Sequence, residues 1–308
     1  MERNEKRGIP EALIAVIAGL ILLAACGLFA FDRLNGGVPT ETSPSSTPSA
    51  TPFADESGSP MPVHCYYPDL RGSALLIVSS RGETVLIDTG FPDDAERLIA
   101  FAEEVGVEKI DLLFLTTPAQ WASGGVSAIS EHFPIGRFIL SETHAERSEA
   151  SEMIELLSGH GTTVDTVCAD FVSTFSAVNN AELRLLSPYR ADYGTGPDSA
   201  LVLRLAYGTS ELMYLSEAGA LAERMMLKAL PNRLLHADVL IAAETDAQET
   251  HLDKFFQTVS PERVVLRDVA GTGTGGLTKT GGKLGLNVTF ADAPLHIVLD
   301  GVTATVLE

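Results

Sequence analysis

The side chains that most often bind metal ions are scattered along this sequence. No two of its seven histidines stand at the i, i+2 or i, i+4 spacing that brings imidazoles to one ion; they are His64, His132, His144, His160, His236, His251 and His296. The three cysteines (Cys26, Cys65 and Cys168) include no C-x-x-C pair. We therefore interpret the histidines as surface or capping residues, with His64 structural on a strand. Cys65 and Cys168 are interpreted as buried thiols, with a disulfide as the alternative.

A glycine-rich segment, residues 271–276, matches G-x-G-x-x-G and follows an expected strand at 264–266. Such a motif binds a dinucleotide when a helix comes next, because the helix N-terminus receives the pyrophosphate. The next residues, Leu-Thr-Lys-Thr-Gly-Gly, form helices poorly. The sequence therefore favours a flexible loop here. No G-x-S-x-G motif supports a nucleophilic serine of the α/β-hydrolase kind.

The N-terminal part predicts an export and anchoring segment. Residues 12–31 form an uncharged, apolar segment of 20 residues. This is about the length that a helix needs to span a membrane. Basic residues at positions 3, 6 and 7 predict a cytoplasmic N-terminus (1–11), with the rest of the chain outside a bacterial cell membrane. Two alternatives remain: a cleaved signal peptide, or a lipoprotein anchored at Cys26 of the sequence Leu-Ala-Ala-Cys-Gly.

The composition of the chain after the apolar segment indicates a linker and an acidic domain. Residues 32–62 are rich in Ser, Thr and Pro, which predicts a solvated linker. The chain has 21 Lys and Arg against 41 Asp and Glu, a formal net charge of −20. This charge argues against binding nucleic acid, whose phosphates need a basic surface. We expect the acidic surface to keep an exposed domain soluble.

From residue 63 onward, hydrophobic periodicity predicts an α/β domain that occupies 63–308. Antiparallel strands come first and β-α alternation follows, and this order occurs twice. It predicts two sheets packed face to face with helices outside, a four-layer αββα sandwich. The expected helices are 92–105, 127–133, 148–157, 220–230 and 251–258; the main expected strands are 63–67, 74–79, 84–87, 110–116, 137–140, 164–168, 183–186, 201–206, 212–215, 239–242, 264–266, 286–290, 296–299 and 302–307.

The order of short motifs along this domain resembles the metallo-β-lactamase superfamily. The opening consists of Gly-Ser-Ala at 72–74, Thr-Val-Leu-Ile-Asp-Thr-Gly at 84–90, Lys-Ile-Asp-Leu-Leu-Phe-Leu-Thr at 109–116 and Gly-Gly at 124–125. Later pieces are Leu-Leu-Ser-Pro at 185–188, Ser-Ala-Leu-Val-Leu-Arg-Leu at 199–205 and Ala-Asp-Val-Leu at 237–240. In this order the motifs look most like the extracytoplasmic domain of ComEC-type competence proteins. The resemblance covers most of 63–308.

The resemblance implies a zinc site that this chain does not reproduce. Active members carry T-H-x-H-x-D-H after a strand, and the bound zinc generates hydroxide. Here Thr117 and Ala119 stand at the first two histidine positions, with Trp121 for the aspartate and Ala122 for the last histidine. Glu217 follows the strand that would carry the bridging aspartate, and Glu244 stands in the segment that would carry the distal histidine. The implied scaffold residues are kept: Asp88 for hydrogen bonds between loops, and Gly90, Gly124 and Gly125 for tight turns.

These features lead to a hypothesis of a non-catalytic, metal-free relative that uses the old cleft or its rim to bind an extracytoplasmic ligand or protein. One alternative is a metal-dependent hydrolase, with zinc held by divergent ligands; another is a scaffold whose role lies in its membrane tether. Trp121 is the single tryptophan, and it has two interpretations: a plug that fills the emptied site, or an aromatic floor for a ligand.

Overall fold

The computed structural model describes residues 61–168, 174–176, 178–189, 196–245, 251–271, 273 and 275–307. The predicted cytoplasmic segment, the anchor at 12–31, Cys26 and the linker up to residue 60 lie outside these residues. Within the described ranges, no helix is long and apolar enough to cross a bilayer.

Two mixed sheets form the centre of the described domain. The first has the strand order β15-β14-β1-β2-β3-β4-β5-β6, antiparallel from β15 to β3 and parallel from β3 to β6. Its strands are β1 (Val63–Tyr67), β2 (Leu75–Ser79), β3 (Thr84–Ile87), β4 (Ile110–Leu115), β5 (Ile135–Ser141), β6 (Thr163–Val167), β14 (Leu295–Leu299) and β15 (Ala304–Leu307).

The second sheet has the order β13-β12-β11-β10-β9-β8-β7, antiparallel from β7 to β10 and parallel from β10 to β13. Its strands are β7 (Thr174–Ser176), β8 (Glu182–Ser187), β9 (Val202–Tyr207), β10 (Ser210–Ser216), β11 (Val239–Glu244), β12 (Arg263–Asp268) and β13 (Val288–Phe290). The expected strands 201–206 and 212–215 correspond to β9 and β10, which pair antiparallel as a hairpin.

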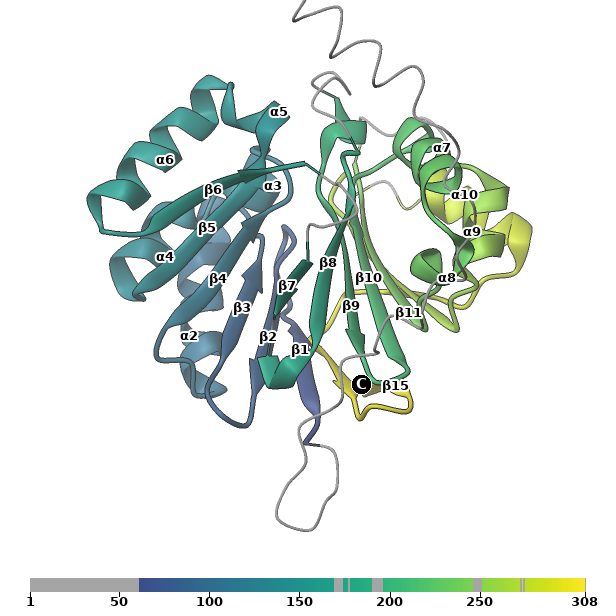
Figure 1. Ribbon diagram of the computed structural model, residues 1–308, viewed down its shortest axis with the longest axis horizontal. Coiled ribbons are helices and arrows are strands. Elements are labelled where there is room, and N and C mark those ends of the chain that lie inside the picture. Colours follow the sequence, from purple (N-terminus) through teal and green to yellow (C-terminus); the bar gives the residue numbers. More distant parts are fainter. Residues whose placement is uncertain are drawn as a thin grey trace, which may run out of the picture. The chain divides into compact units, whose positions relative to one another are not determined.

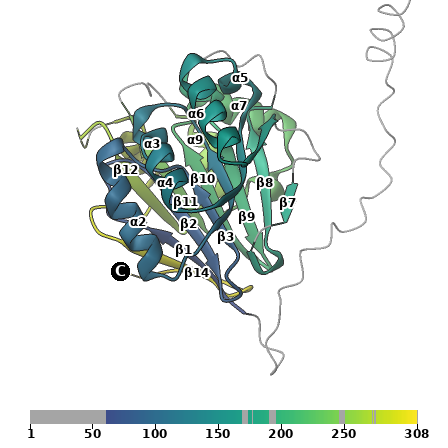
Figure 2. The ribbon, with the colours of Figure 1, turned by 90° about the vertical axis from the view of Figure 1, so that its left-hand side faces the viewer.

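Helices cover the outer face of each sheet (Figures 1 and 2). Successive side chains of β4 point to opposite faces of the sheet. Phe114 packs in the core between the sheets, while Leu113 and Leu115 pack under the helices. The first sheet carries α2 (Ala95–Glu104), α3 (Gln120–Ser123), α4 (Val126–His132), α5 (Glu142–Ala145) and α6 (Ser148–Gly159); the second carries α7 (Ala220–Ala229), α8 (Asn232–Leu235), α9 (Asp253–Val259) and α10 (Gly276–Leu284). The predicted α/β class is confirmed, and the layers are consistent with the predicted αββα order.

The segment after the glycine-rich motif corrects one expectation. We predicted a flexible loop, and the structure has helix α10 there. Leu277 is fully buried under the second sheet, and Gly285 ends the helix with a φ of 66°. Burial of one apolar side and a glycine at the C-terminus outweigh the weak helix propensity of this short sequence.

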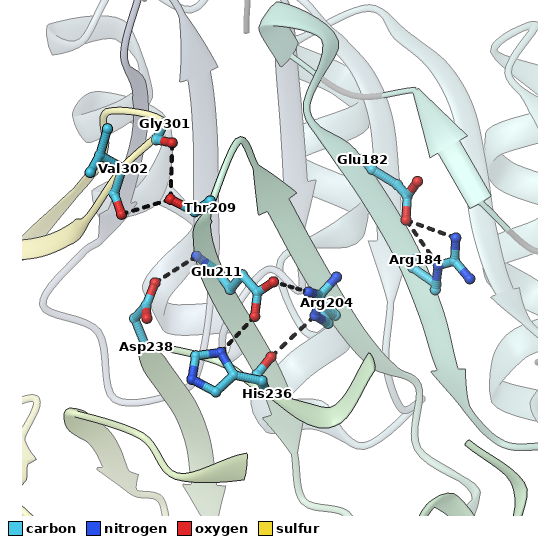
Figure 3. Close-up of polar contacts among 9 residues, drawn as sticks. All are labelled: Glu182, Arg184, Arg204, Thr209, Glu211, His236, Asp238, Gly301 and Val302. Carbon is cyan, nitrogen blue, oxygen red and sulfur yellow. Dashed lines mark hydrogen bonds and ion pairs between the residues drawn. The ribbon is translucent and has the colours of Figure 1, made fainter. Parts of the chain in front are cut away.

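One end of the domain is closed by polar contacts between turns (Figure 3). Thr209, in the turn between β9 and β10, donates its hydroxyl hydrogen to the carbonyl of Val302, with an O···O distance of 3.0 Å. In the same region Arg204 pairs with Glu211 and donates to the carbonyl oxygen of His236. Gly208 has a φ of 60°, and a Cβ atom there would lie 2.2 Å from the carbonyl oxygen of Gly301, so a side chain would separate the turns.

Candidate functional site

The opposite end of the domain gathers the residues that the sequence singled out. Asp88 follows β3, Thr117 follows β4, Glu217 follows β10, and Glu244 ends β11. The carboxyl ends of parallel strands meet at one edge of a sheet, which is where α/β proteins form their sites. In Figure 1 this end lies toward the top, where α5 and α7 follow β5 and β10.

Asp88 joins the two sheets through a buried chain of hydroxyl groups. Its Oδ1 accepts from the backbone N–H of Thr116 at 2.8 Å, and its Oδ2 accepts from the Thr116 hydroxyl at 2.7 Å and the Tyr214 hydroxyl at 2.9 Å. Tyr214 is also 2.5 Å from the Ser73 hydroxyl, and Thr116 is 2.7 Å from the Ser216 hydroxyl. Asp88 therefore fixes the loop after β4 against the second sheet.

Burial raises the pKa of Asp88 to about 7, even though the donors on Thr116 and Tyr214 lower it. The surrounding hydroxyls can turn, so a proton on Oδ2 finds an acceptor in Tyr214 or Thr116. Asp88 has a φ of 61°, a backbone conformation that asparagine also adopts readily. Asparagine is therefore a suitable neutral replacement.

We expect the stability of the protein, measured relative to Asp88→Asn, to fall as the pH rises. The folded-state pKa lies above the unfolded value of about 3.9, so the folded protein binds this proton more tightly. The stabilisation is complete below about pH 4 and is lost as the pH passes about 7. Thermal unfolding of both proteins from pH 5 to 8 measures the difference. A constant difference across this range would contradict the raised pKa.

The loop after β4, which the resemblance implies would carry the zinc ligands, has its apolar side chains packed in a buried cluster. Trp121 has 7% of its surface exposed and packs with Ala122 and Ala243, beside Phe91 and Ala119. Its indole thus lies in a small apolar cluster between the loop after β4 and the end of β11. The side chains that the resemblance places at the third and fourth ligand positions, Trp121 and Ala122, lie in the core.

The scaffold glycines allow close approach of this loop to the loop after β3. The sequence predicted tight turns at Gly124 and Gly125, but both have ordinary negative φ angles. Their role is to allow close contacts that a side chain would prevent. A Cβ atom on Gly125 would lie 2.5 Å from the carbonyl oxygen of Thr89. The backbone N–H of Gly124 donates to the carbonyl of Gly90 at 2.8 Å.

Glu217 lies in a mostly buried polar group. Its Oε2 is 3.4 Å from the hydroxyl of Thr245, and Thr117 is a second hydrogen-bond partner. Burial raises the pKa of Glu217, while Thr117, Thr245 and the positive charge of Arg147 lower it. Two of the predicted positions, Thr117 and Glu217, are therefore brought together, with two hydroxyl groups and a guanidinium as the surroundings of the carboxyl group.

Glu244 caps helix α10. The side chain is fully buried, and its Oε1 accepts from the backbone N–H groups of Leu277 at 2.9 Å and Thr278 at 3.2 Å. Its Oε2 accepts from the Thr278 hydroxyl at 2.6 Å. A Cβ atom on Gly275 would lie 2.0 Å from Glu244, so this glycine gives the carboxyl group its space. The helix N-terminus that could receive a phosphate is already occupied by this internal acceptor.

Sequence analysis missed a buried histidine–serine pair near this end. His144, in α5, has its Nε2 atom 2.8 Å from the hydroxyl of Ser199, and both side chains are buried. Burial, together with the positive charge of Arg147, lowers the pKa of His144 to about 4. Among the described residues no carboxyl group bonds to its Nδ1 atom, so within them the pair lacks the third member of a nucleophilic triad. The two residues are 55 positions apart, and no local spacing could have indicated the contact.

The donor set at this end does not fit a zinc ion. Zinc sites are built from imidazole, thiolate and carboxylate ligands, three or four to an ion. The former ligand positions provide a buried indole, two alanines, a threonine hydroxyl and two separately engaged carboxyl groups. Among the described residues, no group of three or more His, Cys, Asp or Glu side chains could hold a metal ion.

A family model matches the first part of the described domain. The family model described as "Metallo-beta-lactamase superfamily" matches residues 67–116. This segment runs from the end of β1 to the start of the loop that holds Thr117. No curated protein matches the sequence at a significant level.

Several solved structures are similar to the chain at low sequence identity. Zn²⁺-bound PqqB from Methylobacterium extorquens has a TM-score of 0.49 and 12% identity, over 73% of this chain and 86% of that one. A diphosphatase of the PhnP family has a TM-score of 0.45 and 13% identity, over 73% and 83%. The Rm3 metallo-beta-lactamase has a TM-score of 0.40 and 19% identity, over 65% and 82%.

Proposed function

We propose that this protein is a metal-free, non-hydrolytic relative of the metallo-β-lactamase superfamily that works as an extracytoplasmic binding or interaction domain. The proposal rests on the observation that side chains at the former ligand positions are packed or hydrogen-bonded within the domain. Trp121 and Ala122 form an apolar cluster, and Glu244 is held by three donors of α10. A hydrolytic zinc site needs free ligands and an open coordination position.

The motif order that resembles ComEC-type proteins supports an extracytoplasmic location, as do the apolar segment at 12–31 and the linker after it. The end of that linker contacts the domain at its closed end. The carbonyl oxygen of Met61 accepts from the hydroxyl of Tyr207 at 2.5 Å and from the side-chain amide of Asn179 at 3.2 Å. Tyr207 ends β9, so this contact lies near the start of β10, while Ser216 and Glu217 lie at its other end, about 20 Å away.

Elemental analysis of the purified full-length chain, produced with added zinc, tests the proposal. We expect no stoichiometric zinc and no turnover of a cephalosporin or a phosphodiester substrate. The control is the same chain after chelation, which should melt at the same temperature because no metal contributes to folding. One or two zinc ions per chain that are lost when Glu217 is replaced by alanine, with a lower melting temperature after chelation, would overturn the proposal. That result would favour the divergent hydrolase and point to Glu217 as a ligand.

A further inference from the structure

Two histidines from distant parts of the sequence meet on the outer face of the first sheet. Strands β1 and β14 are antiparallel neighbours, with Tyr66 opposite His296 and His64 opposite Val298. His64 and His296 are thus diagonal neighbours on one face of the sheet. The Nδ1 atom of His64 lies 2.9 Å from the Nε2 atom of His296. The two residues are 232 positions apart, which is why the sequence showed no pair.

The surroundings hold these rings in place without enclosing them. The ring of Tyr66 stacks on His296, with 4.5 Å between centroids and 17° between planes, and Phe101 of α2 packs edge-on against Tyr66. Both histidines remain partly exposed. Burial lowers the pKa of each imidazole, and that of His296 is lowered further by His64.

The separation of the two nitrogen atoms matches a shared metal ion. Two nitrogens at 2.0–2.1 Å from one ion are about 2.9 Å apart when the angle at the ion is 90°, and about 3.4 Å apart when it is tetrahedral. The observed 2.9 Å is the length of the hydrogen bond between the two rings, and it also equals the separation expected for the first geometry. Right angles between ligands are typical of tetragonal Cu(II) and Ni(II) sites, whereas zinc prefers the tetrahedral angle.

We propose that His64 and His296 form a surface binding site for a divalent transition-metal ion, with Cu(II) and Ni(II) preferred to Zn(II). The ion replaces the proton that the two imidazoles share, and water completes its coordination. The net charge of −20 raises the local concentration of cations at the surface. This site lies on the outer face of β1 and β14 and uses none of the former ligand positions, so it is independent of the proposed function.

Titration of the full-length chain with Cu(II) at pH 7.5, followed by electron paramagnetic resonance, tests the proposal. We expect a copper signal with coupling to two imidazole nitrogens. His64→Ala and His296→Ala should each weaken binding more than about tenfold, because even second-shell changes at metal sites cost 10–100-fold. Ni(II), which does not oxidise thiols, is the second probe. The matched control is His160→Ala, since His160 is exposed at the end of α6.

The glutamine variants His64→Gln and His296→Gln guard against a folding defect, since they keep a polar side chain of similar length. Their melting temperatures should match that of the unaltered protein, and they should still lose the two-nitrogen signal. If the two histidine variants bind copper as tightly as the unaltered protein does, the site does not exist. Zinc binding that is tighter than that of Ni(II) would overturn the stated preference.

Discussion

Replacing Glu244 with alanine is expected to destabilise the protein by about 3–5 kcal/mol, because three buried donors would lose their acceptor. These donors are the N–H groups of Leu277 and Thr278 and the hydroxyl of Thr278. Glu244 is fully buried, so bulk water cannot replace the lost oxygens without opening the start of α10. Chemical denaturation monitored by circular dichroism measures the loss.

The matched control is Glu244→Gln. The amide oxygen of glutamine can still accept from both N–H groups, and the Thr278 hydroxyl can turn to accept from the amide hydrogens. The variant loses the favourable interaction between a carboxylate and a helix N-terminus, which is worth about 1–2 kcal/mol in a partly buried setting. A loss for Glu244→Ala no larger than that for Glu244→Gln would show that capping is not the role of Glu244. It would leave this residue free to act as a metal ligand.

The segment after the glycine-rich motif shows why the sequence failed to predict α10. Intrinsic propensity describes an isolated helix, whereas this one is fixed by an acceptor on β11, 33 positions earlier than Leu277. Glu244 itself was noticed as a former ligand position, but its partner could not be identified from local spacing. Strands and amphipathic helices were predicted more successfully, since their periodicity reports directly which face is buried.

The same distinction separates what could and could not be predicted at the site. The positions of Asp88, Thr117 and Glu217 were predicted from the resemblance to the superfamily's motifs, and all three lie just after strands. Their partners were not predicted. Tyr214, which donates to Asp88, is 126 positions away, and His144 and Ser199 are 55 positions apart. Contacts between the two sheets depend on register and packing, which one sequence does not specify.

Trp121→Ala is expected to destabilise the protein by about 3–5 kcal/mol, the usual cost of removing a large aromatic side chain from a core. The indole is almost fully buried, and it contacts Ala122 and Ala243 with Phe91 at the edge of the cluster. The two small alanine side chains cannot fill the space. A ligand-binding floor, by contrast, would lose little stability on truncation, because its outer face would already be in contact with solvent.

Trp121→Phe is the matched control, because phenylalanine keeps an aromatic ring in the cluster and leaves a smaller void. We expect its loss of stability to be clearly below that of Trp121→Ala. The backbone is expected to stay in place in both variants, since the carbonyl of residue 121 accepts from the N–H of Ser73 whatever the side chain. Equal losses in the two variants would indicate a backbone disturbance and not the removal of packed volume.

Rescue by indole distinguishes a plug from a surface platform more directly than the stability loss alone. An apolar cavity left by truncation of a core side chain stays dry and binds a small apolar molecule of matching shape. Indole binding to folded Trp121→Ala would raise its melting temperature in a concentration-dependent way, while the unaltered protein would not respond. A platform would behave in the opposite manner: the unaltered protein would bind an aromatic ligand, and the alanine variant would have lost that affinity. The first outcome would mean that packing has replaced chemistry at this position, and that any partner of the domain binds elsewhere on its rim.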